Sequence, residues 1–371
     1  MSYQNKLFKL KTPYDLEASN ELFLKAMQEN CAYQYANCPE YRKILDDKMF
    51  HPGDLKAYED IEKLPFLPTL YFKQHAIFSM PKRKMLIKAT SSGTSGKKSH
   101  MGFNFSSLYR GLRMVLTVGK YHKLLSFKPT HFLIFGYEPH KTNKIVFSKT
   151  AYGFTYFAPA LSRTYALKYT KDGYQLDLES LKERFVKYSN SKFPVRTIGF
   201  PAYTYFLLKQ MKEEGISVKL PKESVLTLGG GWKEFYAKQV SKEEFYKLVE
   251  EVLGIDEQHI IEFFGAVEHP ILYTDCRCHH FHVPVYSRVI IRDVDNLEPV
   301  ENGQVGLVNL VTPMVGSVPI LSVMTDDLGI LHGEGCPCGE ASPWLEILGR
   351  VGIKDIVTCA AGAGEMLKGK E

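Results

Sequence analysis

Hydrophobic positions near the N-terminus recur at helical spacing. A helix entrance is marked by Thr12-Pro13, because proline is tolerated in the first turn. The residues that follow place their apolar members on one helical face, namely Leu16, Leu22, Phe23, Ala26 and Met27. This spacing predicts a long amphipathic helix. A linker with Pro65 and Pro68 comes next, and Met85–Ile87 is predicted as a short strand.

The middle of the chain alternates between strand-like and helix-like segments. Short apolar runs predict strands at His131–Phe135, Arg196–Gly199, Ser224–Leu228 and Ile260–Phe264. Amphipathic runs predict helices at Ser106–Leu125, Leu178–Tyr188, Ala202–Glu214 and Lys233–Leu253. Such alternation is typical of βαβ units, so we expect an α/β fold with a largely parallel sheet.

The pattern changes from about residue 280 onward. Runs rich in Val and Ile, broken by Gly and Pro, occur at Ser287–Ile291, Val305–Val311 and Val318–Met324. These runs predict a smaller β-rich sublobe. The sequence shows no internal repeat or low-complexity segment.

Composition narrows the class of protein. The 371 residues are 44% hydrophobic and 24% charged, which is ordinary for a globular chain. The net charge is only +6, and the basic residues are interspersed with acidic ones. A clustered basic face of the kind that binds nucleic acid is therefore not expected. The N-terminus lacks an apolar signal core and no stretch is long enough to span a bilayer, so we expect a cytoplasmic protein without a transmembrane segment.

A loop rich in hydroxyls and glycines directly follows the first predicted strand. Its members are Thr90, Ser91, Ser92, Gly93, Thr94, Ser95, Gly96, Lys97 and Lys98. Glycines let backbone N–H groups curl around an anion, hydroxyls add donors, and lysine supplies charge. The spacing is not that of a Walker loop, and Ser/Gly runs are often linkers, so the loop alone leaves both interpretations open.

Further motifs follow in order along the chain. Three glycines and a tryptophan, Gly229, Gly230, Gly231 and Trp232, come after a predicted strand, where backbone without Cβ atoms lets a planar base approach. Phe264 and Gly265 precede Glu268, Thr325–Gly329 contains Asp326 and Asp327, and Gly349 precedes Arg350.

Together these motifs resemble those of the adenylate-forming superfamily. The resemblance implies that the loop of residues 91–98 binds phosphates of ATP, although the proline that usually precedes its lysine is missing, so Lys97 and Lys98 compete for that role. It also implies that Glu268 holds Mg²⁺, that the glycine triplet, Phe264 and Gly265 line the adenine, and that Asp327 and Arg350 contact the ribose or phosphate. Asp326 occupies a variable position of the motif, and we expect it to face solvent.

Cysteine and histidine residues cluster in two short segments. Cys276, Cys278, His279, His280 and His282 lie in the first, and Cys336 and Cys338 in the second, giving seven candidate ligands for one tetrahedral Zn²⁺. Similarity to zinc-bearing aryl- and acyl-CoA ligases selects Cys276, His282, Cys336 and Cys338. A site with four protein ligands would be structural.

The short C-terminal segment refines the resemblance. Most adenylate-forming enzymes carry a further domain after the Gly-Arg pair, whereas about twenty residues follow Arg350 here. In this respect the chain resembles the acyl-protein synthetases of bacterial luminescence, the long-chain fatty acid–protein ligases. The resemblance implies that Cys359 accepts the acyl group and passes it to a partner reductase. Lys354, Lys368 and Lys370 are candidates for the lysine that the missing domain would supply.

We therefore expect a large adenylation domain over residues 1–349, with parallel-rich sheets, flanking helices and a β-rich sublobe, followed by a short hinge and tail over 350–371. The hypothesis is ATP- and Mg²⁺-dependent activation of a carboxylic acid, a fatty acid by resemblance, as acyl-AMP, followed by transfer to Cys359. The alternatives are an acyl- or aryl-CoA ligase that uses coenzyme A as acceptor, and a non-catalytic zinc-bearing nucleotide binder.

Overall fold

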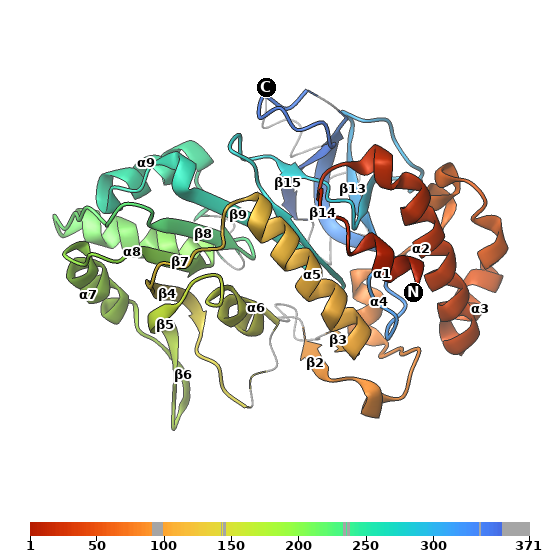
Figure 1. The fold of residues 1–371 in the computed structure, drawn as a ribbon, viewed down its shortest axis with the longest axis horizontal. Helices are drawn as coiled ribbons and strands as arrows, with labels where there is room; N and C mark the ends of the chain where they lie inside the picture. The colour runs from red at the N-terminus through yellow and green to blue at the C-terminus, as the bar shows by residue number, and fades with distance from the viewer. Residues whose placement is uncertain are drawn as a thin grey trace. The chain divides into compact units, whose positions relative to one another are not determined.

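The computed structural model describes residues 1–90, 99–141, 143, 146–232, 235, 238–333 and 335–350. These residues form two compact units (Figure 1). The described residues up to Val118, together with those from Gly265 onward, make the first unit, and those between Gly119 and Phe264 make the second. The two units are described separately below.

The second unit contains a mostly parallel sheet. Its strands follow the order β9-β8-β7-β4-β5-β6, and only the last pair, β5 and β6, is antiparallel. The bounds are β4 Thr130–Tyr137, β5 Ala160–Thr170, β6 Gly173–Leu176, β7 Val195–Gly199, β8 Val225–Gly229 and β9 Ile260–Ala266. The α/β fold with a parallel sheet, expected from the alternation of strand and helix patterns, is confirmed.

Helices cover both faces of this sheet because successive side chains of a strand point to opposite sides. In β4, Leu133 and Phe135 pack in one hydrophobic cluster and Phe132 and Ile134 in another. The first cluster includes side chains of three helices and the second those of the fourth. The helices are α6 Val146–Phe154 in the second cluster, and α7 Leu178–Ser189, α8 Pro201–Glu213 and α9 Lys242–Leu253 in the first.

The first unit contains an antiparallel sheet with the order β11-β15-β14-β13-β12, and β1 pairs in parallel with β14. Its strands are β1 Leu67–Pro68, β11 Phe281–His282, β12 Arg288–Arg292, β13 Val305–Val311, β14 Ser322–His332 and β15 Trp344–Arg350. A hairpin of β2 Ile87–Thr90 and β3 His100–Phe103 and the strand β10 His269–Thr274 also belong to this unit. The β-rich sublobe expected after residue 280 is therefore present.

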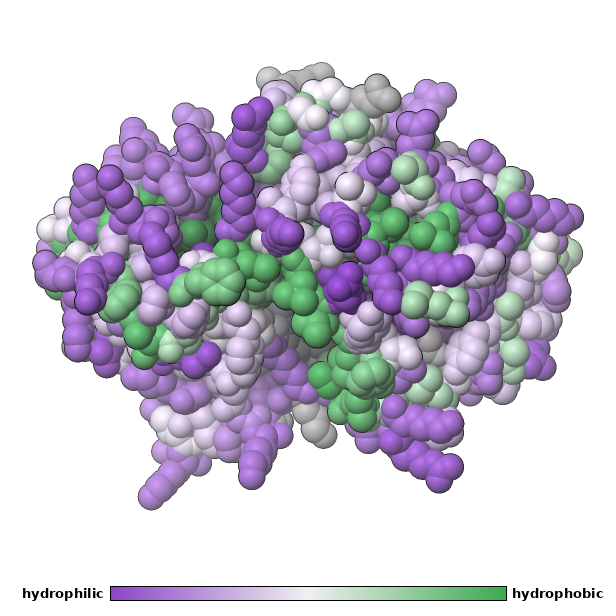
Figure 2. Space-filling model, in the orientation of Figure 1, coloured by the Kyte–Doolittle hydropathy of each residue, from purple (hydrophilic) through white to green (hydrophobic). Residues whose placement is uncertain are grey.

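Helices of the first unit come mainly from the N-terminal part of the chain. They are α1 Tyr3–Leu7, α2 Leu16–Asn37, α3 Pro39–Asp47, α4 Thr69–Gln74 and α5 Phe105–Tyr121, of which the last turn of α5 enters the second unit. Helix α5 exposes Phe105, Leu112 and Leu116, and hydrophobic surface follows this helix in Figure 2. Among the described residues, no helix combines the length and apolar character needed to cross a membrane.

Several element boundaries differ from those expected. The helix expected from Lys233 begins at Lys242, because the hydroxyl of Ser241 accepts a hydrogen bond from the backbone N–H of Glu244 and caps it there. The long N-terminal helix is confirmed, but it begins at Leu16 with Asp15 as its cap. The strand expected at Val318–Met324 is β14, which begins later, at Ser322, and continues to His332.

Candidate functional site

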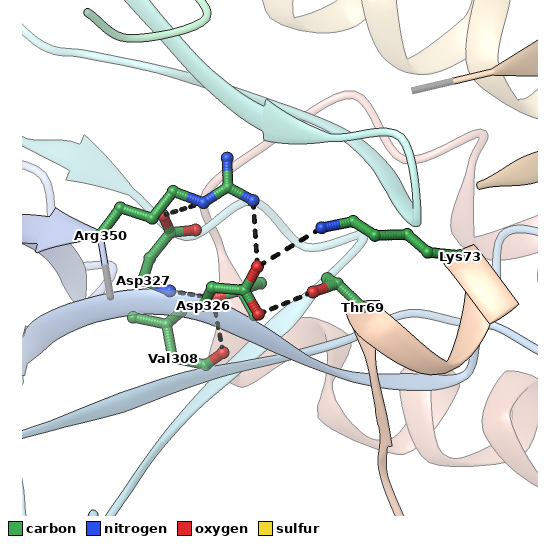
Figure 3. A network of polar contacts seen from close by, with 7 residues as sticks. Thr69, Lys73, Val308, Asp326, Asp327 and Arg350 are labelled. Atoms are coloured by element: carbon green, nitrogen blue, oxygen red, sulfur yellow. Dashed lines mark hydrogen bonds and ion pairs between the residues drawn. The ribbon is translucent and has the colours of Figure 1, made fainter. Parts of the chain in front are cut away.

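Asp326 is the centre of a buried polar cluster in the first unit. Pairing of β1 with β14 places Pro68 beside Met324, so helix α4 begins next to Asp326. The hydroxyl of Thr69, the first residue of α4, donates to Oδ1 of Asp326 over 2.9 Å. Lys73 lies one helical turn later on the same face, and its Nζ is 3.8 Å from Oδ2 of Asp326 (Figure 3).

Arg350 reaches the same carboxylate from strand β15. Its Nη2 is 3.2 Å from Oδ2 of Asp326, and its Nε is 4.0 Å from Oδ1 of Asp327. The antiparallel register of β14 and β15 sets Arg350 opposite Asp327, which explains why both carboxylates are within its reach. In Figure 3 Lys73 and Arg350 approach Asp326 from opposite sides.

The two aspartates differ in their environment. The side chain of Asp326 is 5% exposed and that of Asp327 is 17% exposed. The expectation that Asp326 faces solvent is therefore wrong, because successive residues of β14 point to opposite faces and Asp326 points toward α4. Asp326 anchors the cluster. That the more accessible Asp327 contacts the nucleotide stays a prediction.

Glu268 is a buried carboxyl of the same unit, with 5% of its surface exposed. Burial raises the pKa of Glu268, while the neighbouring Ser99 hydroxyl and the positive charges of Lys73 and Arg350 act in the opposite direction. Glu268 therefore lies within electrostatic range of both cations around Asp326. Ser99 is the first described residue after the predicted phosphate loop.

These surroundings fit the predicted magnesium ligand. Mg²⁺ prefers hard oxygen ligands and is commonly bound by one or two carboxylates together with substrate phosphates. A buried carboxyl whose pKa is raised by desolvation would gain from a divalent cation, which favours its ionised form. The assignment of Mg²⁺ to Glu268 stays a prediction.

The glycine triplet and the Phe-Gly pair lie at the carboxyl ends of neighbouring strands. In the parallel pair β8–β9, Gly229 is opposite Phe263. Gly230 and Gly231 have φ angles of 83° and 67°, a conformation that favours glycine. Trp232 is buried against Tyr205, Phe206 and Phe245, so its indole belongs to the core of the second unit.

The four predicted zinc ligands come together in the first unit. Their ligand atoms, one each from Cys276, His282, Cys336 and Cys338, all lie within 4.8 Å of one another. The sulfurs of Cys276 and Cys336 are 3.7 Å apart, and Nε2 of His282 is 3.3 Å from the sulfur of Cys338. Tetrahedral Zn²⁺ with bonds of about 2.3 Å to sulfur requires sulfurs about 3.8 Å apart, so the spacing fits.

The surroundings of these side chains also suit a metal. Nδ1 of His282 is 2.8 Å from the carbonyl oxygen of Ser342, an arrangement that leaves Nε2 available as a ligand. The backbone N–H groups of Cys278 and Glu340 donate to the sulfurs of Cys276 and Cys338, which favours thiolates. Burial, together with the neighbouring Cys338, raises the pKa of the Cys276 thiol, so a bound metal would have to displace its proton.

The remaining candidate ligands have other partners. The ring of His280 stacks on Trp344 with centroids 3.6 Å apart, and its Nδ1 lies 3.2 Å from the sulfur of Cys336. Nδ1 of His279 is 2.8 Å from a carboxylate oxygen of Asp275. The geometry therefore gathers the set that the resemblance selected, with His280 next to it.

Several predicted residues lie outside the described part of the chain. These are the phosphate loop, Ser91–Lys98, and the C-terminal candidates Lys354, Cys359, Lys368 and Lys370. Sequence reasoning in turn missed Thr69, Lys73, Asp326 and Ser99. A usable signal existed for Asp326, since two successive acidic residues in a buried strand must point to opposite faces.

Comparisons with known proteins give the family of this chain. Residues 8–368 match the family described as acyl-protein synthetase, LuxE. The long-chain-fatty-acid–luciferin-component ligase of Aliivibrio fischeri is 26% identical over 358 residues, covering 96% of this chain and 91% of that protein. The phenylacetate-coenzyme A ligase of Thermus thermophilus is 24% identical over 350 residues, covering 91% of this chain and 72% of that protein.

Solved structures share the fold. A 2-hydroxyisobutyryl-CoA ligase crystallised in its postadenylation state has a TM-score of 0.68 and 17% identity, covering 92% of this chain and 70% of that chain. At that identity the likeness concerns the fold alone. The match to the family over nearly the whole sequence goes further: the chain belongs to the acyl-protein synthetase (LuxE) family and is a ligase of the adenylate-forming superfamily.

Proposed function

We propose that this ligase uses ATP to activate a fatty acid as acyl-AMP and then forms a thioester on its own Cys359. The single observation that carries the activation step concerns Arg350, which lies 4.0 Å from Asp327 and whose positive charge acts on the buried Glu268 of the same unit. Carboxylates for a ribose and for a divalent cation, with a guanidinium between them, suit a nucleoside triphosphate.

The proposed nucleotide contacts divide among the motifs. The ribose hydroxyls donate to Asp327, and Arg350 contacts ribose or phosphate. Residues 91–98 would donate hydrogen bonds to the phosphates, and Glu268 would hold a Mg²⁺, which would supply positive charge to the pyrophosphate portion. The adenine lies against Gly229–Trp232, Phe264 and Gly265.

The first step is a displacement at phosphorus. A carboxylate oxygen of the acid attacks the α-phosphorus of ATP, the bond from that phosphorus to the bridging oxygen of the β-phosphate breaks, and pyrophosphate leaves with the electron pair. In the second step the thiolate of Cys359 attacks the acyl carbon, and AMP leaves. Thiol attack requires a deprotonated sulfur, and we propose Lys354 as the nearby charge that favours the thiolate.

The thioester makes a partner necessary, because an acyl-enzyme turns over only when another molecule accepts the acyl group. We propose an acyl reductase protein in this role. The relative from Aliivibrio fischeri is named for a luciferin component, which is in line with a protein partner. We further propose residues 1–349 as the acyl- and nucleotide-binding domain, residues 350–371 as hinge and tail, a structural Zn²⁺ at the cysteine–histidine group, and a cytoplasmic location.

An exchange experiment tests the activation step. Wild-type protein, ATP, Mg²⁺ and labelled pyrophosphate are incubated with saturated fatty acids of graded chain length, and label entering ATP is measured. Acid-dependent exchange is expected, whereas ATP binding without exchange for every acid tried would contradict the proposal. Acyl-enzyme is then followed on a gel with labelled acid, and Cys359→Ser should abolish protein labelling while exchange persists.

A coenzyme A ligase is the second candidate, favoured by the similarity to a phenylacetate-coenzyme A ligase over 91% of this chain. In that case coenzyme A replaces Cys359 as the acceptor. The Cys359→Ser variant, given ATP, labelled fatty acid and coenzyme A, distinguishes the two. Undiminished formation of acyl-coenzyme A by this variant would favour the second candidate.

A further inference from the structure

Lys73 stands out among the described residues as a nearly buried ammonium with incomplete pairing. Its side chain is 9% exposed, and its interaction within the described part of the chain is the ion pair with Asp326 at 3.8 Å. That distance is too long for a hydrogen bond. An ammonium carries three N–H donors, and burying a charge without hydrogen-bond partners is costly.

Asp326 does not need Lys73 for its own hydrogen bonds. Oδ1 of Asp326 accepts from Thr69 at 2.9 Å, and Oδ2 accepts from Arg350 at 3.2 Å. Lys73 therefore approaches a carboxylate whose two oxygens are already bonded. Its helix position is fixed by the pairing of β1 with β14, which holds α4 against this carboxylate.

The location of Lys73 relates it to two parts of a nucleotide. It lies beside Asp326, the neighbour of the proposed ribose ligand Asp327, and it acts electrostatically on Glu268, the proposed ligand of the phosphate-bound cation. The α-phosphate is the covalent link between the ribose and the pyrophosphate portion of ATP. Lys73 shares Oδ2 of Asp326 with Arg350, and Arg350 in turn reaches Asp327, so the ammonium lies within reach of the α-phosphate of a nucleotide held by Asp327 and Glu268.

We propose that Lys73 is a catalytic residue of the adenylation step and donates hydrogen bonds to a non-bridging oxygen of the α-phosphate. This inference rests on the proposed function. Negative charge grows on the α-phosphoryl oxygens as the acid carboxylate attacks, and an ammonium held in a site shielded from water stabilises it. Lys73 keeps its proton throughout, and the electron pair of the broken bond leaves with pyrophosphate. Lys73 thereby supplies the positive charge for adenylation that the sequence analysis expected from a C-terminal lysine.

The test compares pyrophosphate exchange by wild type, Lys73→Met and the control Lys63→Met. Lys63 is an exposed lysine of the same unit, paired with Asp60 at 2.9 Å. Lys73→Met is expected to lower kcat for exchange about 100-fold or more, with KM for the acid changed less than about threefold. Lys63→Met is expected to match wild type. Transfer of the acyl group from chemically prepared acyl-AMP to the protein should persist in Lys73→Met.

A double-mutant cycle separates catalysis from neutralisation of Asp326. In an Asp326→Asn background Lys73 has lost its ion-pair partner, so a lysine that serves only to neutralise Asp326 becomes dispensable there. We expect Lys73→Met to lower kcat about 100-fold in this background as well. Equal exchange by Asp326→Asn and the double variant would overturn the inference. The double variant also decides the matter if Lys73→Met alone does not fold, since it removes both charges together.

The remaining outcomes are distinct. Exchange by wild type and equal exchange by folded Lys73→Met would overturn the role of Lys73 and leave the proposed function standing. Absence of exchange in wild type with every acid would overturn the proposed function and this inference with it.

Discussion

The hydroxyl of Thr69 lies 2.9 Å from the carboxylate of Asp326, although 257 positions separate the two residues. The contact exists because the two-residue strand β1 pairs in parallel with β14 and ends where helix α4 begins. A short segment before the first sheet thus supplies two side chains, Thr69 and Lys73, to the carboxylate pair on β14. This relationship underlies the first prediction.

Substitution of Asp326 should mainly lower stability, whereas substitution of Asp327 should mainly weaken nucleotide binding. Asp326→Asn leaves Lys73 buried without a counter-charge, and we expect it to lower the free energy of unfolding by about 2–3 kcal/mol. Asp327→Asn should cost less than about 1 kcal/mol and weaken ATP binding by roughly tenfold, because a charged hydrogen-bond acceptor is lost. Urea unfolding and calorimetric titration with ATP measure the two effects. Equal stability losses would contradict the division of roles.

Removal of one thiol of the cysteine–histidine group should release a metal. We expect about one Zn²⁺ per purified wild-type chain and less than about half of that in Cys336→Ser, with a Tm lower by roughly 4 °C or more. Cys278→Ser is the matched control, because its sulfur is not among the four gathered ligand atoms. Metal content is measured by mass spectrometry. Zinc retained by Cys336→Ser would argue for a different ligand set.

The positive φ angle of Gly230 predicts a backbone requirement at the carboxyl end of β8. Gly230→Ala places a Cβ on a residue with φ of 83°, and we expect a loss of about 1–2 kcal/mol. Gly153→Ala is the control, because a Cβ there meets nothing within 4 Å and the residue lies in helix α6, where alanine should stabilise by about 0.5–1 kcal/mol. Thermal unfolding of both variants measures the difference in stability. Unchanged stability of Gly230→Ala would show that glycine is not required at this position.

Protonation of His131 should destabilise the second unit at acidic pH. Burial, together with the positive charges of Lys187 and Arg184, lowers the pKa of His131 in the folded protein below its ordinary value near 6.5. Its ring stacks on Tyr188 and lies 2.9 Å from the hydroxyl oxygen of Ser162. Below pH ~6.5 the unfolded chain binds this proton more readily than the folded chain, so the contribution to stability falls as the pH falls from ~6.5 toward the folded pKa.

The measurement compares unfolding free energies of wild type and His131→Gln between pH 5 and 8. Glutamine keeps polar atoms for the neighbouring hydroxyls but does not titrate. We expect the wild type to lose stability more steeply below pH ~6.5 than the variant, by at most about 1.4 kcal/mol per pH unit. Parallel curves would show that the pKa of His131 is not lowered by folding.

Part of the parallel sheet could be predicted from sequence because several of its strands are short apolar runs, which are mostly buried in β4, β7 and β8. The expected Arg196–Gly199 and Ile260–Phe264 differ from β7 and β9 by one or two residues at an end. Strand β1 and helix α4 could not be predicted in this way. They comprise two and six residues, too few for a periodic pattern, and they are stabilised by pairing with a strand far along the chain.

The candidate site shows the same limit. Motif order selected Glu268, Asp327 and Arg350 as candidates, because each stands within three residues of the glycine of a recognisable motif. Lys73 has no motif around it, and its relevance appears only when β1 pairs with β14. The grouping of Cys276 with Cys336 was predicted from resemblance, and in the fold the register of β11 and β15 brings the two segments together.

The paired strands β14 and β15 connect the carboxylate pair Asp326 and Asp327 with the cysteine–histidine group. Asp327 faces Arg350 at one end of this hairpin, and His332 faces Trp344, the residue stacked on His280 beside the thiols, at the other. The strand length between these ends is thus fixed by requirements at both. If one residue were inserted between Trp344 and Arg350, the strand could keep the pairing of Trp344 with His332 or that of Arg350 with Asp327, but not both. This stretch should therefore tolerate substitution far better than a change of length.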